Sequence, residues 1–286
     1  MIGLCCDSGA QLPPDLVARH GIEVVPLTVT VAGRDWQEGV DLDADSFWAH
    51  FDHGRTPEVA TAAPAPGAFA DAYARLAERG AEQIISVHTG SEISGTFNAA
   101  RLGAEAAAVP VELVDTGVAS FAVGLAALAA AEALLAGAGA NQAAAVARAA
   151  ASSSGNVFVV GALDLPLEGG RLAPGVDVAA AAEGIPVLQV VGGTMDVIGQ
   201  ATDVDDAAAQ MADAVLAAGH RLRVGIARAD RDSWPLADAF RQRLERLDAT
   251  LELLEYRVGP SVGAHTGPGT TGAVYHPVPD VNASDV

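Results

Sequence analysis

Short apolar runs alternate with alanine-rich, amphipathic stretches through the first half of the chain. The apolar runs are rich in Val, Ile and Leu, which is typical of buried β-strands, and they lie at 2–6, 22–31, 83–88 and 111–114. Helical patterns separate them at 13–20, 43–53, 67–78, 94–108, 119–135 and 142–152, with a Pro- and Ala-rich loop at 56–66. This rhythm predicts parallel βαβ units with helices on both faces of the sheet.

A second series of strands and helices begins near residue 155. Strands are predicted at 156–160, 222–226, 251–256 and 273–276, a hairpin from 185–191 and 195–199, and helices at 205–218 and 231–247. We therefore predict an α/β fold of two α/β domains, spanning 1–155 and 156–286. The N-terminal domain is expected to hold a mainly parallel sheet flanked by helices.

Composition narrows the possible partners. The 286 residues are 50% hydrophobic and carry a formal net charge of -20, and all 16 basic residues are Arg. This acidic excess argues against nucleic acid and anionic membrane surfaces as partners, because both attract cationic patches. An anionic ligand would need a local positive site. The adjacent Cys5 and Cys6 give neither a metal-site spacing nor a disulfide framework, so we expect them to pack in the core.

One segment is long enough to span a bilayer. Residues 118–140 contain a single charged residue, Glu132, but they are mostly Ala and Gly and have no flanking Lys or Arg. A buried helix is the better interpretation, so no stable membrane insertion is expected. Met1 is followed directly by a strand-like run, without a basic segment. We therefore expect a cytoplasmic protein.

Ligand chemistry is expected in the loops that follow the parallel strands, because open α/β sheets bind ligands at the carboxyl ends of their strands. Ser94 stands where a helix begins after the strand 83–88. A serine there caps the helix, and the N–H groups at Ser94, Gly95 and Thr96 with the helix dipole would also attract a carboxylate or phosphate. The sequence leaves both interpretations open. Thr61, in the loop before the helix predicted at 67–78, is a further polar candidate.

Two more candidates come from the second half. Arg171 follows two glycines on a predicted loop, and its guanidinium suits a planar anion. His265, with Thr266 beside it, lies in a glycine-rich segment that we predict to be a loop. Gly267 to Gly272 matches G-x-G-x-x-G, but it contains a Pro and precedes a strand, so we reject a dinucleotide site. Without Lys there is no Walker loop, and the seven His lack the H-E-x-x-H spacing, so we expect neither a cofactor nor a metal.

Taken in order, these segments resemble the DegV family over nearly the whole chain. The resemblance rests on Asp7-Ser8-Gly9-Ala10-Gln11-Leu12-Pro13, Val25-Pro26-Leu27, Gly39-Val40-Asp41, Ser94-Gly95-Thr96-Phe97, Val114-Asp115-Thr116 with Ser120, Gly169-Gly170-Arg171-Leu172 and His265-Thr266-Gly267-Pro268-Gly269. Where the family usually shows Thr-Ser-x-Pro-Ser, this chain has Thr61-Ala62-Ala63-Pro64-Ala65. Two hydroxyl groups of that loop are therefore missing here.

The resemblance implies a non-catalytic protein that holds a long-chain fatty acid in a buried tunnel, between or within the domains. It also implies a partner, the ATP-dependent fatty acid kinase subunit, which would convert the fatty acid to acyl phosphate for phospholipid synthesis. Thr61 and Ser94 would bind the carboxylate, with the backbone at Gly95 and Thr96. His265 would orient the carboxylate, and Arg171 would lie near it and near the kinase surface.

Two other functions remain open. The same site would serve another amphipathic anion, such as an isoprenoid or a retinoid-like acid. Alternatively, Ser94 as nucleophile and His265 as base would make a hydrolase, which needs an acidic residue to orient His265 and an oxyanion hole.

Overall fold

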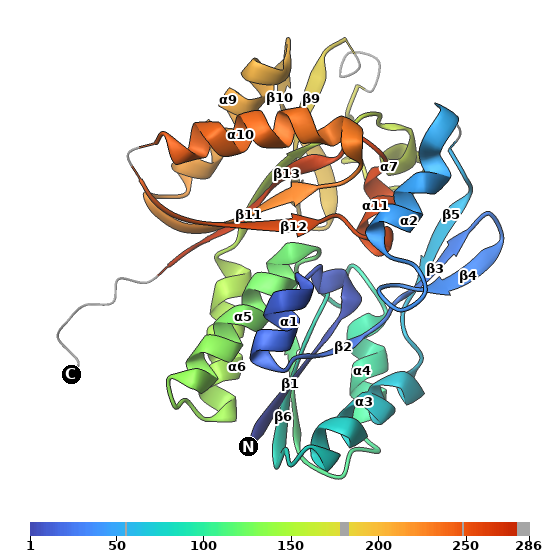
Figure 1. Cartoon of the computed structure of the whole chain (residues 1–286), viewed down its shortest axis with the longest axis vertical. Coiled ribbons are helices and arrows are strands. Elements are labelled where there is room, and N and C mark those ends of the chain that lie inside the picture. Colours follow the sequence, from blue (N-terminus) through green and yellow to red (C-terminus); the bar gives the residue numbers. More distant parts are fainter. Residues whose placement is uncertain (55, 178–182, 248, 279–286) are drawn as a thin grey trace.

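The computed structural model describes residues 1–54, 56–177, 183–247 and 249–278, and Figure 1 shows their arrangement. Most of the first half forms the lower body in this view, with helices on both sides of a sheet, whereas α2 (Ala44–Trp48) and β5 (Val59–Ala62) lie at the side of the upper body. The second half forms the upper body around a second sheet, and α9 (Val204–Ala217) and α10 (Trp234–Glu245) cover it. The predicted α/β fold is confirmed.

The first sheet is parallel throughout, in the order β2-β1-β6-β7. Its strands are β1 (Ile2–Asp7), β2 (Glu23–Val25), β6 (Gln83–His88) and β7 (Val111–Asp115). The flanking helices are α1 (Pro14–His20), α3 (Pro66–Glu78), α4 (Thr96–Ala104), α5 (Phe121–Leu135) and α6 (Ala140–Ser152). Side chains alternate across the sheet, so Cys6 packs toward α5 and α6 while Cys5 packs toward α3 and α4. Both thiols are free and buried, as predicted for core residues.

The second sheet is mixed, in the order β10-β9-β8-β13-β11-β12. Its strands are β8 (Gly155–Val159), β9 (Ile185–Val191), β10 (Thr194–Ala201), β11 (Arg221–Arg228), β12 (Thr250–Arg257) and β13 (Thr271–Pro277). Only β11 and β12 pair in parallel, and the predicted hairpin of β9 and β10 is confirmed. Two short helices, α7 (Asp164–Glu168) and α11 (Pro260–Thr266), lie beside this sheet.

A third sheet was not predicted. We predicted one strand over 22–31, but the chain breaks at Pro26 into β2 and β3 (Thr28–Val31), which belong to different sheets. Proline lacks the N–H that a continuous ladder needs. β3 pairs with β4 (Arg34–Gln37) and with β5 (Val59–Ala62), which occupies the segment predicted as a loop.

Helices also differ from the prediction at two places. The helix predicted at 43–53 is α2 (Ala44–Trp48) followed by a 3₁₀ segment, Ala49–Gly54. The predicted loop around His265 is the helix α11, which begins with Pro260 in its first turn. Proline fits this position because the first helical N–H has no partner in the helix.

The third sheet links the two halves, because β3, β5 and α2 all contact α11. The division at residues 155 and 156 therefore stays a prediction about folding units. The apolar segment 118–140 contains α5, of which eleven residues are buried in the protein. None of the helices in the described ranges combines the length and the apolar character that crossing a bilayer requires.

Candidate functional site

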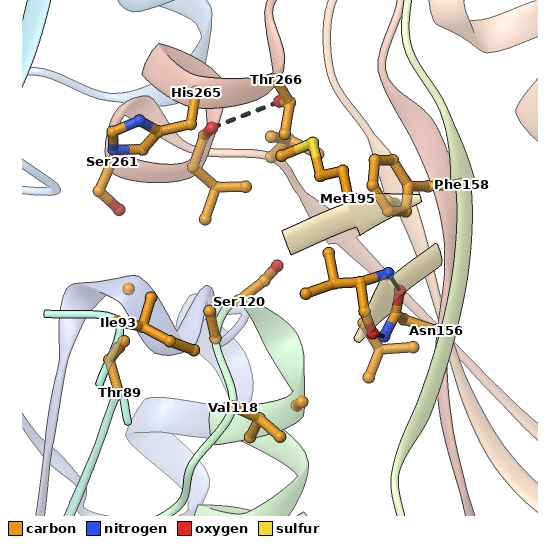
Figure 2. A pocket seen from close by; sticks show the side chains of 18 of the residues that line it. Thr89, Ile93, Val118, Ser120, Asn156, Phe158, Met195, Ser261, His265 and Thr266 are labelled. Carbon is orange, nitrogen blue, oxygen red and sulfur yellow. Dashed lines mark hydrogen bonds between the residues drawn. The ribbon is translucent and has the colours of Figure 1, made fainter. Parts of the chain in front are cut away.

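A cavity of about 300 Å³ lies between the two halves of the protein. Figure 2 shows side chains facing it from both: Thr89, Ile93, Val118 and Ser120 from below, and Phe158, Met195, Ser261, His265 and Thr266 from above. The first group lies in the loops after β6 and β7, and Gly9 follows β1. The cavity is therefore at the carboxyl ends of the parallel strands, where the sequence predicted a ligand site.

Thr61 and His265 meet at the wall of this cavity although 204 residues separate them in sequence. The Thr61 Oγ1 atom lies 3.0 Å from Nε2 of His265. Thr61 is held on β5, and His265 is held in the last turn of α11. Burial, followed by the positive charge of Arg171, lowers the pKa of His265 below its ordinary value. The neutral imidazole is therefore favoured, in which one ring nitrogen donates a hydrogen bond and the other accepts one.

Arg171 supplies positive charge to the cavity. Gly170, with a φ of 64°, turns the chain just before it. The Arg171 N–H donates to Pro166 O, and its carbonyl accepts from Met195 N at 2.6 Å, so its backbone is fixed. Its guanidinium forms no hydrogen bond or ion pair with the described residues, and among them it is the one permanently charged group that lines the cavity. An unpaired guanidinium at a largely apolar cavity favours an anionic ligand.

Ser94 lines the cavity, whereas Gly95 and Thr96 do not. The Ser94 hydroxyl lies 2.8 Å from Oγ1 of Thr96 and accepts a bond from Thr96 N at 3.3 Å. Thr96 is fully buried, and Gly95 is exposed at the start of α4. The N-cap of α4 is Gly95 and not Ser94, so the predicted helix start lies two residues too early. Ser94 stands just before the cap, where it accepts from the first N–H of the helix and also faces the cavity.

Thr266 also lines the cavity. Its hydroxyl donates to Val262 O at 3.3 Å within α11, so it offers a ligand only an acceptor. The rest of the wall is mainly apolar, with Val118, Phe158, Val190, Met195, Tyr256 and Val274 among its side chains. An apolar cavity with a few polar groups gathered in its wall is typical of sites for amphipathic ligands.

The hydrolase arrangement of Ser94 and His265 is not formed. His265 Nε2 contacts Thr61, the Ser94 hydroxyl contacts Thr96, and no described acidic residue bonds His265. Gly259-Pro260-Ser261-Val262-Gly263 also matches G-x-S-x-G, the motif of the hydrolase nucleophile elbow. Ser261 nevertheless lies in the first turn of α11 without the positive φ of a strained turn, and its hydroxyl accepts from Gln11 Nε2 at 3.4 Å. It therefore lacks the setting of a nucleophile elbow.

A buried Asp–His–Ser chain supports the loop that carries Ser94. Asp7 Oδ2 lies 3.0 Å from His88 Nδ1 and accepts from Thr89 N, while Oδ1 accepts from the Thr89 hydroxyl. His88 Nε2 lies 2.6 Å from Ser86 Oγ. Ser86 is fully buried and does not line the cavity, so this chain is structural. It fixes Thr89 at the cavity edge.

Glu38 holds the start of α11 in place through buried hydrogen bonds. Its buried carboxylate accepts from Ser8 Oγ at 2.5 Å and from Ser261 N at 2.8 Å. The Gln11 side chain joins Glu38 to the backbone N–H of Gly259. The start of α11 is thereby tied to the segment after β1. The sequence signalled this contact through two family-like motifs. Ser8 and Gln11 lie within the motif at 7–13, and Glu38 directly precedes the motif at 39–41.

Ser120 and Tyr256 form a polar pair that the sequence did not reveal. Ser120 has a φ of 59° and a ψ of -151°, a region that residues other than Gly rarely adopt. Burial raises the pKa of Tyr256 to about 12, and the nearby Ser120 side chain opposes this rise without cancelling it. Both residues line the cavity.

Comparisons with known proteins give one consistent result. A sequence model described as "Uncharacterised protein, DegV family" matches residues 1–278. A DegV domain-containing protein of Streptomyces coelicolor is 38% identical over 279 residues, which cover 96% of this chain and 97% of that protein. Another from Deinococcus radiodurans is 30% identical over 281 residues, covering 97% and 99%.

Solved structures agree with these relatives. A fatty-acid-binding DegV family protein from Thermus thermophilus superposes with a TM-score of 0.86 at 28% identity, covering 97% of this chain and 99% of that one. DegV from Bacillus subtilis, described as a fatty acid binding protein, superposes with a TM-score of 0.81 at 21% identity, covering 97% and 99%. The second likeness concerns the fold alone.

Proposed function

Because this chain belongs to the DegV family, we propose that it binds a long-chain fatty acid in the cavity between its two halves. One observation carries the proposal: the guanidinium of Arg171, which has no partner among the described residues, lies beside the Thr61–His265 contact at the wall of a mainly apolar cavity. The carboxylate would lie at these residues and at the Ser94 hydroxyl, with the acyl chain along the apolar wall.

The energetics favour this division of roles. A buried carboxylate is costly unless charged or polar donors meet it, and Arg171, Thr61, Ser94 and His265 would supply them. Each buried methylene contributes about 0.8 kcal/mol, so the chain would supply most of the affinity and the polar groups would fix its orientation. Association and ordering costs consume much of that gain.

The finer part of the proposal concerns the fate of the bound fatty acid. We propose that the protein acts without catalysis of its own in the cytoplasm, and that it presents the carboxylate to an ATP-dependent kinase subunit. That partner would transfer the γ-phosphoryl group of ATP to the carboxylate oxygen, giving acyl phosphate and ADP. Consistent with this, the sequence has no Walker loop. ATP turnover by the purified chain alone would contradict it.

The direct test is to extract lipid from the purified protein and to titrate the protein, once delipidated, with palmitate. Thr61→Ala combined with Ser94→Ala should weaken palmitate binding and leave thermal unfolding near that of the parent. A matched control, Thr202→Ala with Ser152→Ala, removes two hydroxyls at exposed positions outside the cavity. If the cavity double variant binds palmitate as the parent does, the assignment of the carboxylate site is wrong.

Two outcomes of the same experiments would favour the other functions. If the protein takes up an isoprenoid or retinoid-like acid but no fatty acid, the site serves another amphipathic anion. If a serine-reactive fluorophosphonate labels Ser94 or Ser261, the protein is a hydrolase.

A further inference from the structure

A second cavity, of about 620 Å³ and more open to solvent than the first, lies next to it. Within the part of the chain that the structure describes, Tyr256 is the single residue that lines both. Close to it in sequence, Val258 lines the first cavity and Gly259 lines the second, so the chain here separates the two cavities. Likewise Gly9 faces the first cavity and Ala10 the second. Tyr256 and these two segments therefore form a common wall.

The chemistry of the second cavity suits a neutral hydrocarbon. Aliphatic side chains cover much of it, among them Leu12, Val17, Val24, Leu42 and Pro260. The two guanidinium groups in its lining are already paired: Arg228 contacts Asp238 and Glu255, and Arg257 lies 2.8 Å from Asp45. The wall also carries four carboxylates, those of Asp7, Glu38, Asp43 and Glu255. A second anionic group would be repelled there, whereas an acyl tail would not.

Tyr256 is held firmly in this wall. Its side chain is 6% exposed, and its ring stacks on Phe121 with centroids 4.4 Å apart and planes 15° apart. Phe121 is confined in turn, because a Cβ on Gly225 would lie 2.2 Å from its ring. The ring is thus fixed by burial and by stacking on a neighbour that is itself confined.

We propose that Tyr256 determines the length of acyl chain that the protein accepts, an inference that rests on the fatty-acid function proposed above. The first cavity is at the small end of the range for ligand sites, about 300–1,000 Å³. A chain that outgrows it ends against the Tyr256 ring. Removing the ring joins the two cavities, and the tail of a longer chain then enters the second one.

The test compares the affinities of the full-length parent and of Tyr256→Ala for palmitate, stearate, arachidate and behenate, each two methylenes longer than the one before. In the parent, affinity should stop rising once the chain meets the ring. In Tyr256→Ala it should continue to rise, by up to about tenfold for each pair of methylenes. Tyr256→Phe keeps the ring and should keep the ranking of the parent.

A second substitution locates the tail. Ala44 lines only the second cavity, so Tyr256→Ala with Ala44→Phe should restore the parent ranking. If Tyr256→Ala does not fold, as judged by thermal unfolding, Tyr256→Leu replaces it in the same comparison. Palmitate binding with an unchanged ranking, or no restoration by Ala44→Phe, overturns the role of Tyr256 and leaves the fatty-acid function intact. If the parent binds no fatty acid, both proposals fail.

Discussion

Replacing Arg171 by Gln removes the positive charge from the cavity and keeps most of the side-chain volume. In the proposed complex the guanidinium donates charge-assisted hydrogen bonds to the carboxylate, and a bond to a charged group is worth about 1.5–3 kcal/mol. Arg171 is only partly buried, so solvent screening favours the lower figure. A loss of about 1.5 kcal/mol corresponds to a roughly tenfold higher dissociation constant for palmitate.

Calorimetric titration of the delipidated protein measures this change. Methyl palmitate has the same chain without the charge, so its affinity should be equal for the parent and for Arg171→Gln. Arg19→Gln removes an exposed arginine outside the cavity and controls for the loss of one positive charge from a protein of net charge -20. Thermal unfolding of Arg171→Gln should match that of the parent, because the guanidinium has no partner among the described residues.

Two results would refute this reasoning. If Arg171→Gln binds palmitate within about twofold of the parent, the guanidinium does not meet the carboxylate. If methyl palmitate loses as much affinity as palmitate, the substitution acts through packing. The ligand-free variant gives an independent check: the charge of Arg171 depresses the pKa of His265, so this pKa, followed by NMR, should rise in Arg171→Gln.

Three further predictions concern stability, each followed by chemical or thermal unfolding. The pKa of His265 in the folded state lies below its ordinary value, so its neutral form adds to the free energy of unfolding. This addition is complete above about pH 6.5 and is lost as the pH falls, and His265→Gln should make the free energy of unfolding less dependent on pH in this range. Asp7→Ala leaves buried donors unpaired and should cost about 2–4 kcal/mol. Ala65→Ser should stabilise the start of α3 by about 0.5–2 kcal/mol and leave palmitate affinity unchanged, because Ala65 is an N-cap outside the cavity.

Strands whose position follows from the local sequence alone were predicted correctly. The strand at 83–88 and the hairpin of β9 and β10 follow from apolar runs and turn residues alone. β5 was missed because its sequence, Val-Ala-Thr-Ala, is weak locally and becomes a strand only by pairing with β3, about thirty residues earlier. Such a partner cannot be read from the segment itself.

The helix α11 was missed for a different reason. Gly263 suggested a loop, but it lies in the middle of a helix that packs closely on α2. A Cβ at this position would lie 2.7 Å from Phe47 and 2.8 Å from Trp48. The glycine therefore reflects close contact between elements and not a turn. His265 owes its place at the cavity to this packing, which no local pattern could reveal.

Two alanines, Ala62 and Ala65, replace family serines near Thr61, and their surroundings show whether those serines would reach the cavity. Side chains alternate along β5, so Ala62 points away from the cavity that Thr61 lines, and it is exposed. Ala65 is the N-cap of α3 and makes no side-chain capping bond. Neither position lines the cavity, so a serine there would cap a helix or face solvent. The carboxylate site that we propose therefore rests on Thr61, Ser94, Arg171 and His265 and does not include the missing hydroxyls.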